Sequence, residues 1–314
     1  MQKLAIILPC YNEQEILPKT IKTIDKLLNK LINAKQISPS SRICFVNDGS
    51  KDKSLKIITD ICSENKHFCC INLSRNFGHQ GAILAGMNEI SADIYVTIDA
   101  DLQDNPDCIC EMLNKINEGC DIVYGVRDSR DTDSWFKRTT AVCYYRLLKF
   151  LGVNIVYNHA DFRMMTKRAV ETLKQFPERN LFLRAIIPLV GFKSAQVYYD
   201  RTKRQAGESK YPLPKMIALA WNGISNFSIV PLRLVTFSGF LICFMSFIFL
   251  CYVIYNWSAK GTIVGWASLV TIITIFSGVQ MISLGIIGEY LAKVFIEVKK
   301  RPLYIVESKI NIDN

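Results

Sequence analysis

Two long stretches of the chain contain no charged residue, Leu234 to Ala259 and Gly261 to Gly288. About 20 apolar residues in a helix are enough to cross the hydrocarbon core of a membrane. Runs of this length are rare in soluble domains, where the alternative is a pair of buried core helices. We therefore expect two transmembrane helices, at residues 232–256 and 262–288, joined by a short link into a hairpin.

Basic residues are almost absent from the link between these stretches, which carries only Lys260. Cations flank the pair on its outer sides, with Arg233 before the first stretch and Lys299, Lys300 and Arg301 after the second. Positively charged loops stay on the cytoplasmic side of a membrane. We therefore expect a multi-pass protein of the inner (plasma) membrane with both termini in the cytoplasm.

A secretory signal is also missing, because the apolar run from Lys3 to Pro9 leads into a polar segment without a small-residue cleavage site. We expect a cytosolic domain at residues 1–212 and a cytosolic tail at residues 289–314. The 11 cysteines form no C-x-x-C pair. A zinc site from Cys69, Cys70, Cys108, Cys110 and a histidine is the weaker alternative, and we interpret the cysteines as small, reduced core residues.

The formal net charge of +10 predicts partners of negative charge. Lipid headgroups, a nucleotide diphosphate and nucleic acid all have this property. With membrane helices present, the first two account for the charge, so we expect no nucleic-acid partner.

The first 125 or so residues alternate short apolar runs with amphipathic stretches. This rhythm predicts an α/β domain with a mostly parallel, Rossmann-like sheet covered by helices. The expected strands are Leu4–Leu8, Arg42–Asn47, Cys69–Leu73, Ile94–Ile98 and Ile122–Tyr124, and the clearest helices are Glu15–Leu31 and Ser54–Cys62.

Polar and acidic residues follow four of these strands directly. Ligands bind beyond the carboxyl ends of strands in such sheets, so these residues should converge on one edge. Asp99 and Asp101 are two positions apart, which places both carboxylates on one side of an extended backbone. Such a pair suits Mg²⁺ or Mn²⁺ bound to the diphosphate of a nucleotide.

Aromatic, apolar and basic side chains are mixed at helical spacing in residues 134–150. This pattern predicts a helix in the membrane interface, with an amphipathic helix docked on the sheet as the alternative. A second amphipathic helix is expected at residues 213–231, directly before the first membrane span.

Several motifs occur together in the order expected of one enzyme family. They resemble the GT-A fold, family 2 glycosyltransferases, and among these the polyisoprenyl-phosphate glycosyltransferases, which include dolichol-phosphate mannose synthase and bactoprenol glucosyltransferases. The motifs are Pro9-Cys10-Tyr11-Asn12-Glu13, Asn47-Asp48-Gly49-Ser50, Ser74-Arg75-Asn76-Phe77-Gly78-His79-Gln80-Gly81, Asp99-Ala100-Asp101-Leu102-Gln103-Asp104, Asp161-Phe162-Arg163 and Arg204-x-x-Gly207-x-Ser209-Lys210-Tyr211.

The resemblance implies a role for each matching position. Asp161 would be the catalytic carboxylate. The metal site would comprise Asp99, Asp101 and Gln103. The nucleotide-sugar site would comprise Pro9, Tyr11, Asn12, Glu13, Asp48, Arg75 and Ala100. Arg204, Ser209 and Lys210 lie in the last motif, and we expect them to form the lipid-phosphate site together with Arg127 and Arg138, which are basic residues near the predicted membrane face.

The implied reaction is inverting transfer of a sugar from a nucleotide donor to a polyisoprenyl (undecaprenyl) phosphate. A lipid phosphate is already largely ionised at neutral pH, so the acceptor needs no general base. Asp161 would then orient groups or stabilise positive charge. His79 has no carboxylate partner in the sequence, and we expect a packing or hydrogen-bonding role for it.

Two other functions compete with this interpretation. A processive polysaccharide synthase needs more membrane helices than two, and the Gln/Arg-x-x-Arg-Trp segment of that family is absent. A non-catalytic nucleotide-sugar-binding scaffold would not need the acidic pair or Asp161. UDP-glucose is our default donor, with UDP-linked N-acetylhexosamines, UDP-aminoarabinose derivatives and GDP-mannose left open. A homo-oligomer is also left open, since the strand-like Leu303–Val306 suits pairing between subunits.

Overall fold

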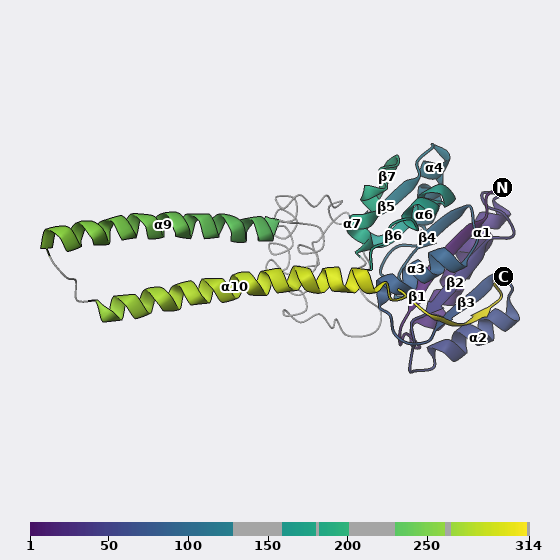
Figure 1. Cartoon of the computed structure of the whole chain (residues 1–314). Helices are drawn as coiled ribbons and strands as arrows, with labels where there is room; N and C mark the ends of the chain where they lie inside the picture. The colour runs from purple at the N-terminus through teal and green to yellow at the C-terminus, as the bar shows by residue number, and fades with distance from the viewer. Residues whose placement is uncertain (128–158, 180–181, 201–229, 261–264, 313–314) are drawn as a thin grey trace. The chain divides into compact units, whose positions relative to one another are not determined.

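The computed structural model describes residues 1–127, 159–179, 182–200, 230–260 and 265–312 (Figure 1). These residues divide into two compact units. One unit combines the N-terminal domain with the C-terminal segment from Arg301, and the other contains the two long helices. The predicted interfacial helix at 134–150 and nearly all of the predicted helix at 213–231 lie outside the described residues.

An eight-stranded sheet of order β7-β5-β6-β4-β1-β2-β3-β8 forms the centre of the first unit. Neighbouring strands are parallel except where β6 pairs with β4 and β5 and where β8 pairs with β3. The mostly parallel sheet is therefore confirmed. The strands are β1 (Leu4–Cys10), β2 (Arg42–Asn47), β3 (Phe68–Leu73), β4 (Ile94–Thr97), β5 (Ile122–Arg127), β6 (His159–Thr166), β7 (Ser194–Tyr199) and β8 (Val306–Ile310).

Helices of two kinds pack on this sheet. α1 is amphipathic and buries Leu17, Ile24, Leu28 and Leu31 at helical spacing. α3 is instead buried over most of its length, and a Cβ on Gly86 would lie 2.4 Å from Ile7 Cγ2, so only glycine permits this close approach. The helices are α1 (Leu17–Asn33), α2 (Ser54–Glu64), α3 (His79–Glu89), α4 (Cys108–Asn117), α6 (Lys167–Leu173) and α7 (Leu183–Leu189).

β6 runs in the opposite direction to its neighbour β4, and this places the first residues of β6 near the end of β4. β6 runs antiparallel to β4 with Arg163 opposite Thr97. Continuing that register by two residues brings Asp161 opposite Asp99. The amino end of β6 therefore lies at the same edge of the sheet as the carboxyl ends of the parallel strands.

The C-terminal segment adds the edge strand β8 to the first unit. β8 pairs with β3 of the same chain, and the backbone N–H of Ser74 donates to the carbonyl of Ile305 at 3.0 Å. The sequence left open whether Leu303–Val306 pairs between subunits. In the structure the strand begins at Val306 and covers the edge of its own β3, and the predicted tail at 289–314 is divided between a helix and this strand.

The second unit contains α9 (Val230–Lys260) and α10 (Trp266–Lys299), which contact each other. Within the described residues, Ile275–Lys299 is long and apolar enough to cross a membrane, and Leu232–Ile242 is a shorter apolar stretch. Large apolar side chains on both helices are exposed, Phe237 and Met281 among them, so these are not buried core helices. The two-span hairpin at 232–256 and 262–288 stays a prediction.

Candidate active site

Three loops that follow β1, β2 and β3 meet at the carboxyl edge of the sheet, and we call them the loop side (residues 11–16, 48–54 and 74–78). The first two are joined by side chains that bind backbone. Ser50 Oγ accepts the N–H of Asn12, and Asn12 Oδ1 accepts the N–H of Lys51 at 2.8 Å. The N–H of Glu13 donates to Ser54 Oγ at 3.0 Å. These bonds fix the loop that carries the predicted nucleotide-binding residues.

Asp48 joins the second loop to the third. Its buried carboxylate accepts the backbone N–H groups of Phe77 and Gly78 at 2.7 and 3.0 Å. Burial raises the pKa of Asp48, and these two hydrogen bonds oppose that shift. Gly49 has a φ of +66°, and a Cβ there would lie 2.5 Å from the backbone carbon of Arg75. Asp48 therefore holds the third loop in place, and its predicted contact with a nucleotide stays a prediction.

The other predicted nucleotide-binding residues differ in their exposure. Tyr11 and Arg75 are exposed, and the Arg75 guanidinium lies 4.0 Å from the centre of the Phe77 ring. Pro9 and Ala100 are buried in the fold. An exposed aromatic ring and an exposed guanidinium can stack on a base or bind a phosphate, whereas the two buried residues shape the backbone beneath them.

The acidic segment Asp99–Asp104 turns sharply after β4. Leu102 has a φ of 54°, a left-handed conformation that costs a branched side chain roughly 1–2 kcal/mol. The turn is held by Asp101 Oδ1, which accepts the N–H of Gln103 at 3.1 Å, and by the Thr20 hydroxyl, which donates to the carbonyl of Ala100 at 2.6 Å. The backbone at Leu102 is thus strained, and strained residues of this kind are common at functional sites.

Asp99 lies among like charges. Its pKa is raised to about 6, mainly by burial; His79 opposes this shift, and the carboxylates of Asp104, Asp161 and Asp101 contribute to it. A bound divalent cation favours the ionised carboxylate and would reverse this shift. Within the described residues, no three His, Cys, Asp or Glu side chains are grouped to hold a metal ion. Two carboxylates and an amide would need further ligands, such as diphosphate oxygens and water, to complete the coordination of a hard cation, so the metal site of Asp99, Asp101 and Gln103 stays a prediction.

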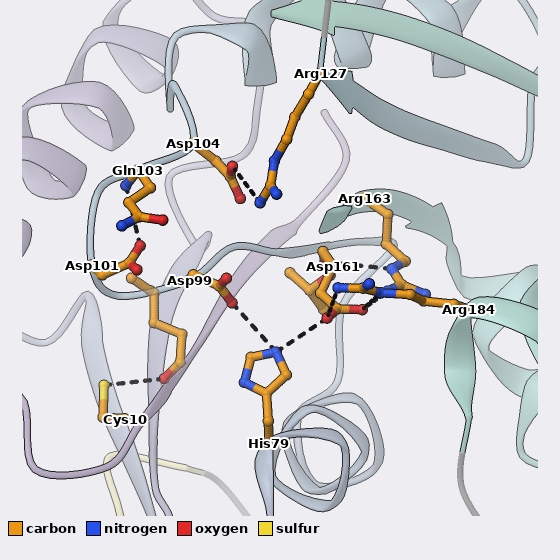
Figure 2. Close-up of polar contacts among 12 residues, drawn as sticks. Cys10, His79, Asp99, Asp101, Gln103, Asp104, Arg127, Asp161, Arg163 and Arg184 are labelled. Atoms are coloured by element: carbon orange, nitrogen blue, oxygen red, sulfur yellow. Dashed lines mark hydrogen bonds and ion pairs between the residues drawn. The ribbon is translucent and has the colours of Figure 1, made fainter. Parts of the chain in front are cut away.

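Asp161 lies beyond the acidic segment, held by two arginines, and we call Asp161, Arg163 and Arg184 the clamp side (Figure 2). Arg163 is fully buried on the same face of β6 and pairs with Asp161 Oδ1. Arg184, from α7, donates to both carboxylate oxygens, with Nη2 2.9 Å from Oδ2 and Nε 3.3 Å from Oδ1. Burial alone would raise the pKa of Asp161, but Arg184, His79 and Arg163 hold it well below its usual range.

His79 links the clamp side to the acidic segment. Its Nε2 lies 3.3 Å from Asp99 Oδ1 and 3.5 Å from Asp161 Oδ2 (Figure 2). Burial favours the neutral ring, yet the two carboxylates raise the pKa of His79 above its usual value. The structure thus supplies the carboxylate partners that the sequence alone does not reveal. His79 opens α3, and its neighbour Gln80 accepts the N–H of Leu183, which positions α7.

Arg127 is the one predicted lipid-phosphate residue within the described part of the chain. Its guanidinium lies 3.4 Å from Asp104 Oδ1, which also accepts the Tyr199 hydroxyl at 2.6 Å. Asp104 is buried, so both contacts connect the acidic segment to the ends of β5 and β7. The other predicted members of this site, Arg138, Arg204, Ser209 and Lys210, lie outside the described residues.

Reasoning from the sequence missed two parts of this arrangement. Arg163 belongs to a motif that we noted, but nothing in the pattern indicated that it is buried and paired with Asp161. Arg184 belongs to no motif, and α7 is a seven-residue helix whose contact with β6 is tertiary. A basic residue inside a short apolar run is the only signal that could have suggested it.

Comparison with known proteins gives consistent matches. The family model described as Glycosyl transferase family 2 matches residues 5–174. The uncharacterised glycosyltransferase YkoT of Bacillus subtilis is 46% identical over 97% of this chain and 91% of its own length. The prophage bactoprenol glucosyl transferase homolog of Escherichia coli is 36% identical over 97% of this chain and 98% of its own.

A phage protein and a solved structure are also similar. The bactoprenol glucosyl transferase of Shigella phage SfV is 36% identical over 98% of this chain and 99% of its own. Glucosyl-3-phosphoglycerate synthase from Mycobacterium tuberculosis, crystallised with Mn²⁺, UDP and phosphoglyceric acid, aligns with a TM-score of 0.47 at 16% identity. That alignment covers 71% of this chain and 76% of the other.

Proposed function

Because this chain belongs to glycosyltransferase family 2, we propose that it transfers a sugar from a nucleotide donor to the phosphate of a polyisoprenyl lipid. The default donor is UDP-glucose and the default acceptor is undecaprenyl phosphate. Relatives 36% identical over nearly their full length carry the name bactoprenol glucosyl transferase, which supports the lipid acceptor. The apolar helix Ile275–Lys299 supports placement at a membrane, where such a lipid lies.

One geometric observation carries the proposal. Asp99 lies opposite the ionised Asp161 across the junction of β4 and β6, with His79 within 3.5 Å of both carboxylates, and Asp101 follows Asp99 in the acidic segment. Carboxylates of this kind beside a diphosphate site suit a Mg²⁺ or Mn²⁺ ion, which when bound would stabilise the charge of the departing nucleoside diphosphate. Tyr11 and Arg75 are exposed on the loop side, which supports a role for them in binding the nucleoside and phosphates of a donor.

The state of Asp161 decides the kind of catalysis. A general base must have a pKa close to the working pH, and the pKa of Asp161 lies well below its usual range. The lowered pKa supports a role for Asp161 as a fixed negative charge beside the reacting centre, in place of a proton acceptor. A phosphate acceptor is consistent with this, because it is ionised before it attacks. Single displacement on an α-linked donor gives a β-linked lipid phosphate sugar.

The proposal is tested with the full chain in detergent, labelled UDP-glucose and undecaprenyl phosphate. Asp101→Ala should reduce transfer by more than the 10- to 100-fold that loss of an outer-shell partner costs at a metal site. Label recovered in the lipid fraction measures the product. Full activity of Asp101→Ala would refute the metal assignment, and donor binding without transfer to any lipid phosphate would favour a scaffold. A panel of nucleotide-sugars identifies the sugar.

A further inference from the structure

Tyr199 is the last residue of β7 and lies beside the candidate active site. β7 runs parallel to β5, with Tyr199 opposite Arg127 in the register. The carboxyl ends of these strands therefore lie at the edge of the sheet where ligands bind in folds of this class. The Tyr199 side chain is buried, and none of the sequence motifs noted above contains it. A residue outside every motif thus reaches the site.

The hydroxyl of Tyr199 binds the acidic segment. It donates to Asp104 Oδ1 at 2.6 Å. Burial raises the pKa of Tyr199 and Asp104 raises it further, so the hydroxyl keeps its proton and acts as the donor. Asp104 Oδ2 is buried and has no hydrogen-bond partner within the part of the chain that the structure describes. Because a buried carboxylate with few partners is costly, the Tyr199 hydroxyl is important for holding Asp104 in place.

Asp104 is the last residue of the acidic segment, Asp99–Asp104. The Thr20 hydroxyl holds the start of the turn in this segment through a backbone carbonyl. Asp104 holds its end through its contacts with β5 and β7 (Figure 2). Asp101 and Gln103, which we predict to bind a cation, lie between these two points. Their positions therefore depend on both.

The ring of Tyr199 packs on the strand that carries Asp161. It meets the Phe162 ring edge to face, with the ring centres 5.6 Å apart and the planes at 75°. Phe162 follows Asp161 on β6. Gly125 leaves room for this contact, because a Cβ there would lie 2.8 Å from Phe162 Cδ1 and 3.1 Å from Tyr199 Cε1. One side chain thus contacts the acidic segment with its hydroxyl and β6 with its ring.

We propose that Tyr199, acting through Asp104, is a positioning residue that fixes the acidic segment relative to Asp161. Asp101 and Gln103 are then held where a cation and the donor diphosphate bind. This inference rests on the function proposed above. The role is indirect and requires no contact between Tyr199 and either substrate.

The experiment uses Tyr199→Phe, which removes the hydroxyl and keeps the ring on Phe162. The affinity of the full chain in detergent for UDP is measured by calorimetry with and without Mn²⁺. Tyr199→Phe should reduce the affinity gained on adding Mn²⁺ about 10- to 100-fold, the loss typical of outer-shell partners at metal sites, and should change the affinity without metal less than about twofold. A purely structural role would lower the thermal midpoint and leave the gain from Mn²⁺ unchanged.

Tyr198→Phe is the matched control. Tyr198 is the neighbour of Tyr199 on β7, so its side chain points to the opposite face of the sheet. It is exposed, and its hydroxyl donates to Gln196 Oε1 at 2.8 Å. Loss of this hydroxyl should change neither UDP affinity nor the gain from Mn²⁺.

Two results would overturn the assignment. One is a gain from Mn²⁺ in Tyr199→Phe equal to that of the wild type. The other is an equal loss of UDP affinity with and without Mn²⁺, which would place the effect outside the acidic segment. If wild-type protein transfers no sugar to lipid phosphate, the proposed function fails. The UDP measurement needs no lipid, so it decides the role of Tyr199 separately.

Discussion

The loop side and the clamp side of the site are built by different interactions. On the loop side, uncharged side chains and Asp48 bind backbone N–H groups, so the loops hold one another through many modest hydrogen bonds. On the clamp side, one carboxylate and two guanidinium groups bind each other, and Arg163 is fully buried. Single hydrogen bonds contribute about 1 kcal/mol, whereas an uncompensated buried charge costs several times more. The clamp side should therefore tolerate substitution less well.

The largest effect is expected for Asp161→Asn. The amide leaves Arg163 buried without a counter-charge, which should lower the free energy of unfolding by about 3–5 kcal/mol and abolish transfer. Thermal melting in detergent and the lipid-product assay measure the two effects. Asp121→Asn is the control, because its partner Arg168 is mostly exposed and its loss should cost about 1 kcal/mol or less. Equal losses in the two variants would contradict the difference between the sides.

A smaller effect is expected for Gly49→Ala on the loop side. A side chain at this φ costs roughly 1–2 kcal/mol, and overlap of its Cβ with the backbone of Arg75 and Asn76 adds about 1–3 kcal/mol. UDP affinity should fall with stability, because the loops move apart.

Gly119→Ala separates the conformational cost of a side chain at positive φ from the cost of steric overlap in Gly49→Ala. Gly119 has a φ of +86°, and its added Cβ would meet no atom within 4 Å. Its cost should therefore be the conformational part alone, with UDP affinity unchanged. Equal thermal midpoints for Gly49→Ala and Gly119→Ala would show that the close contact between the second and third loops does not contribute to the loss of stability.

The smallest effect is expected where the C-terminal segment grips α3. Glu89 accepts the Tyr304 hydroxyl and pairs with Lys309, both at 2.8 Å. Burial raises the pKa of Glu89, but these partners lower it overall. The contribution to stability is thus present above the ordinary glutamate pKa and lost as the pH falls through the lowered value.

Glu89→Gln should therefore reduce stability by about 1 kcal/mol or less at neutral pH and by nothing in acid. Thermal midpoints across a pH series measure this difference. A midpoint difference that stays constant down to pH 3 would show that the Glu89 charge is not involved. The kcat and the KM values of Glu89→Gln should equal those of the wild type.

The sequence predicts the loop side better than the clamp side for a physical reason. In parallel strands, apolar runs mark the strands and polar residues mark their carboxyl ends, so β1 to β5 and the residues after β1 to β4 were placed correctly. Asp161 lies instead near the start of a strand, and it reaches the same edge only because β6 is antiparallel. The resemblance to a family identified Asp161, whereas strand-end reasoning alone does not.

The remaining misses involve pairing at long range. Arg163 and Arg184 stand 21 residues apart, as their numbers show, and both bind Asp161 from different elements. The sequence identifies these residues as charged, but no sequence pattern indicates which charged residues pair in the folded protein. The same limit applies to β8, whose partner β3 lies more than 200 residues earlier in the chain.

The place of β8 in the chain imposes an order on synthesis. A ribosome completes β3 early, but the strand that covers its edge emerges only after α9 and α10 have been made. Until then the nascent sheet has a backbone edge able to pair with any extended chain. Synthesis of both helices thus precedes closure of the sheet, and a translation arrest between them would leave a domain with that edge still open.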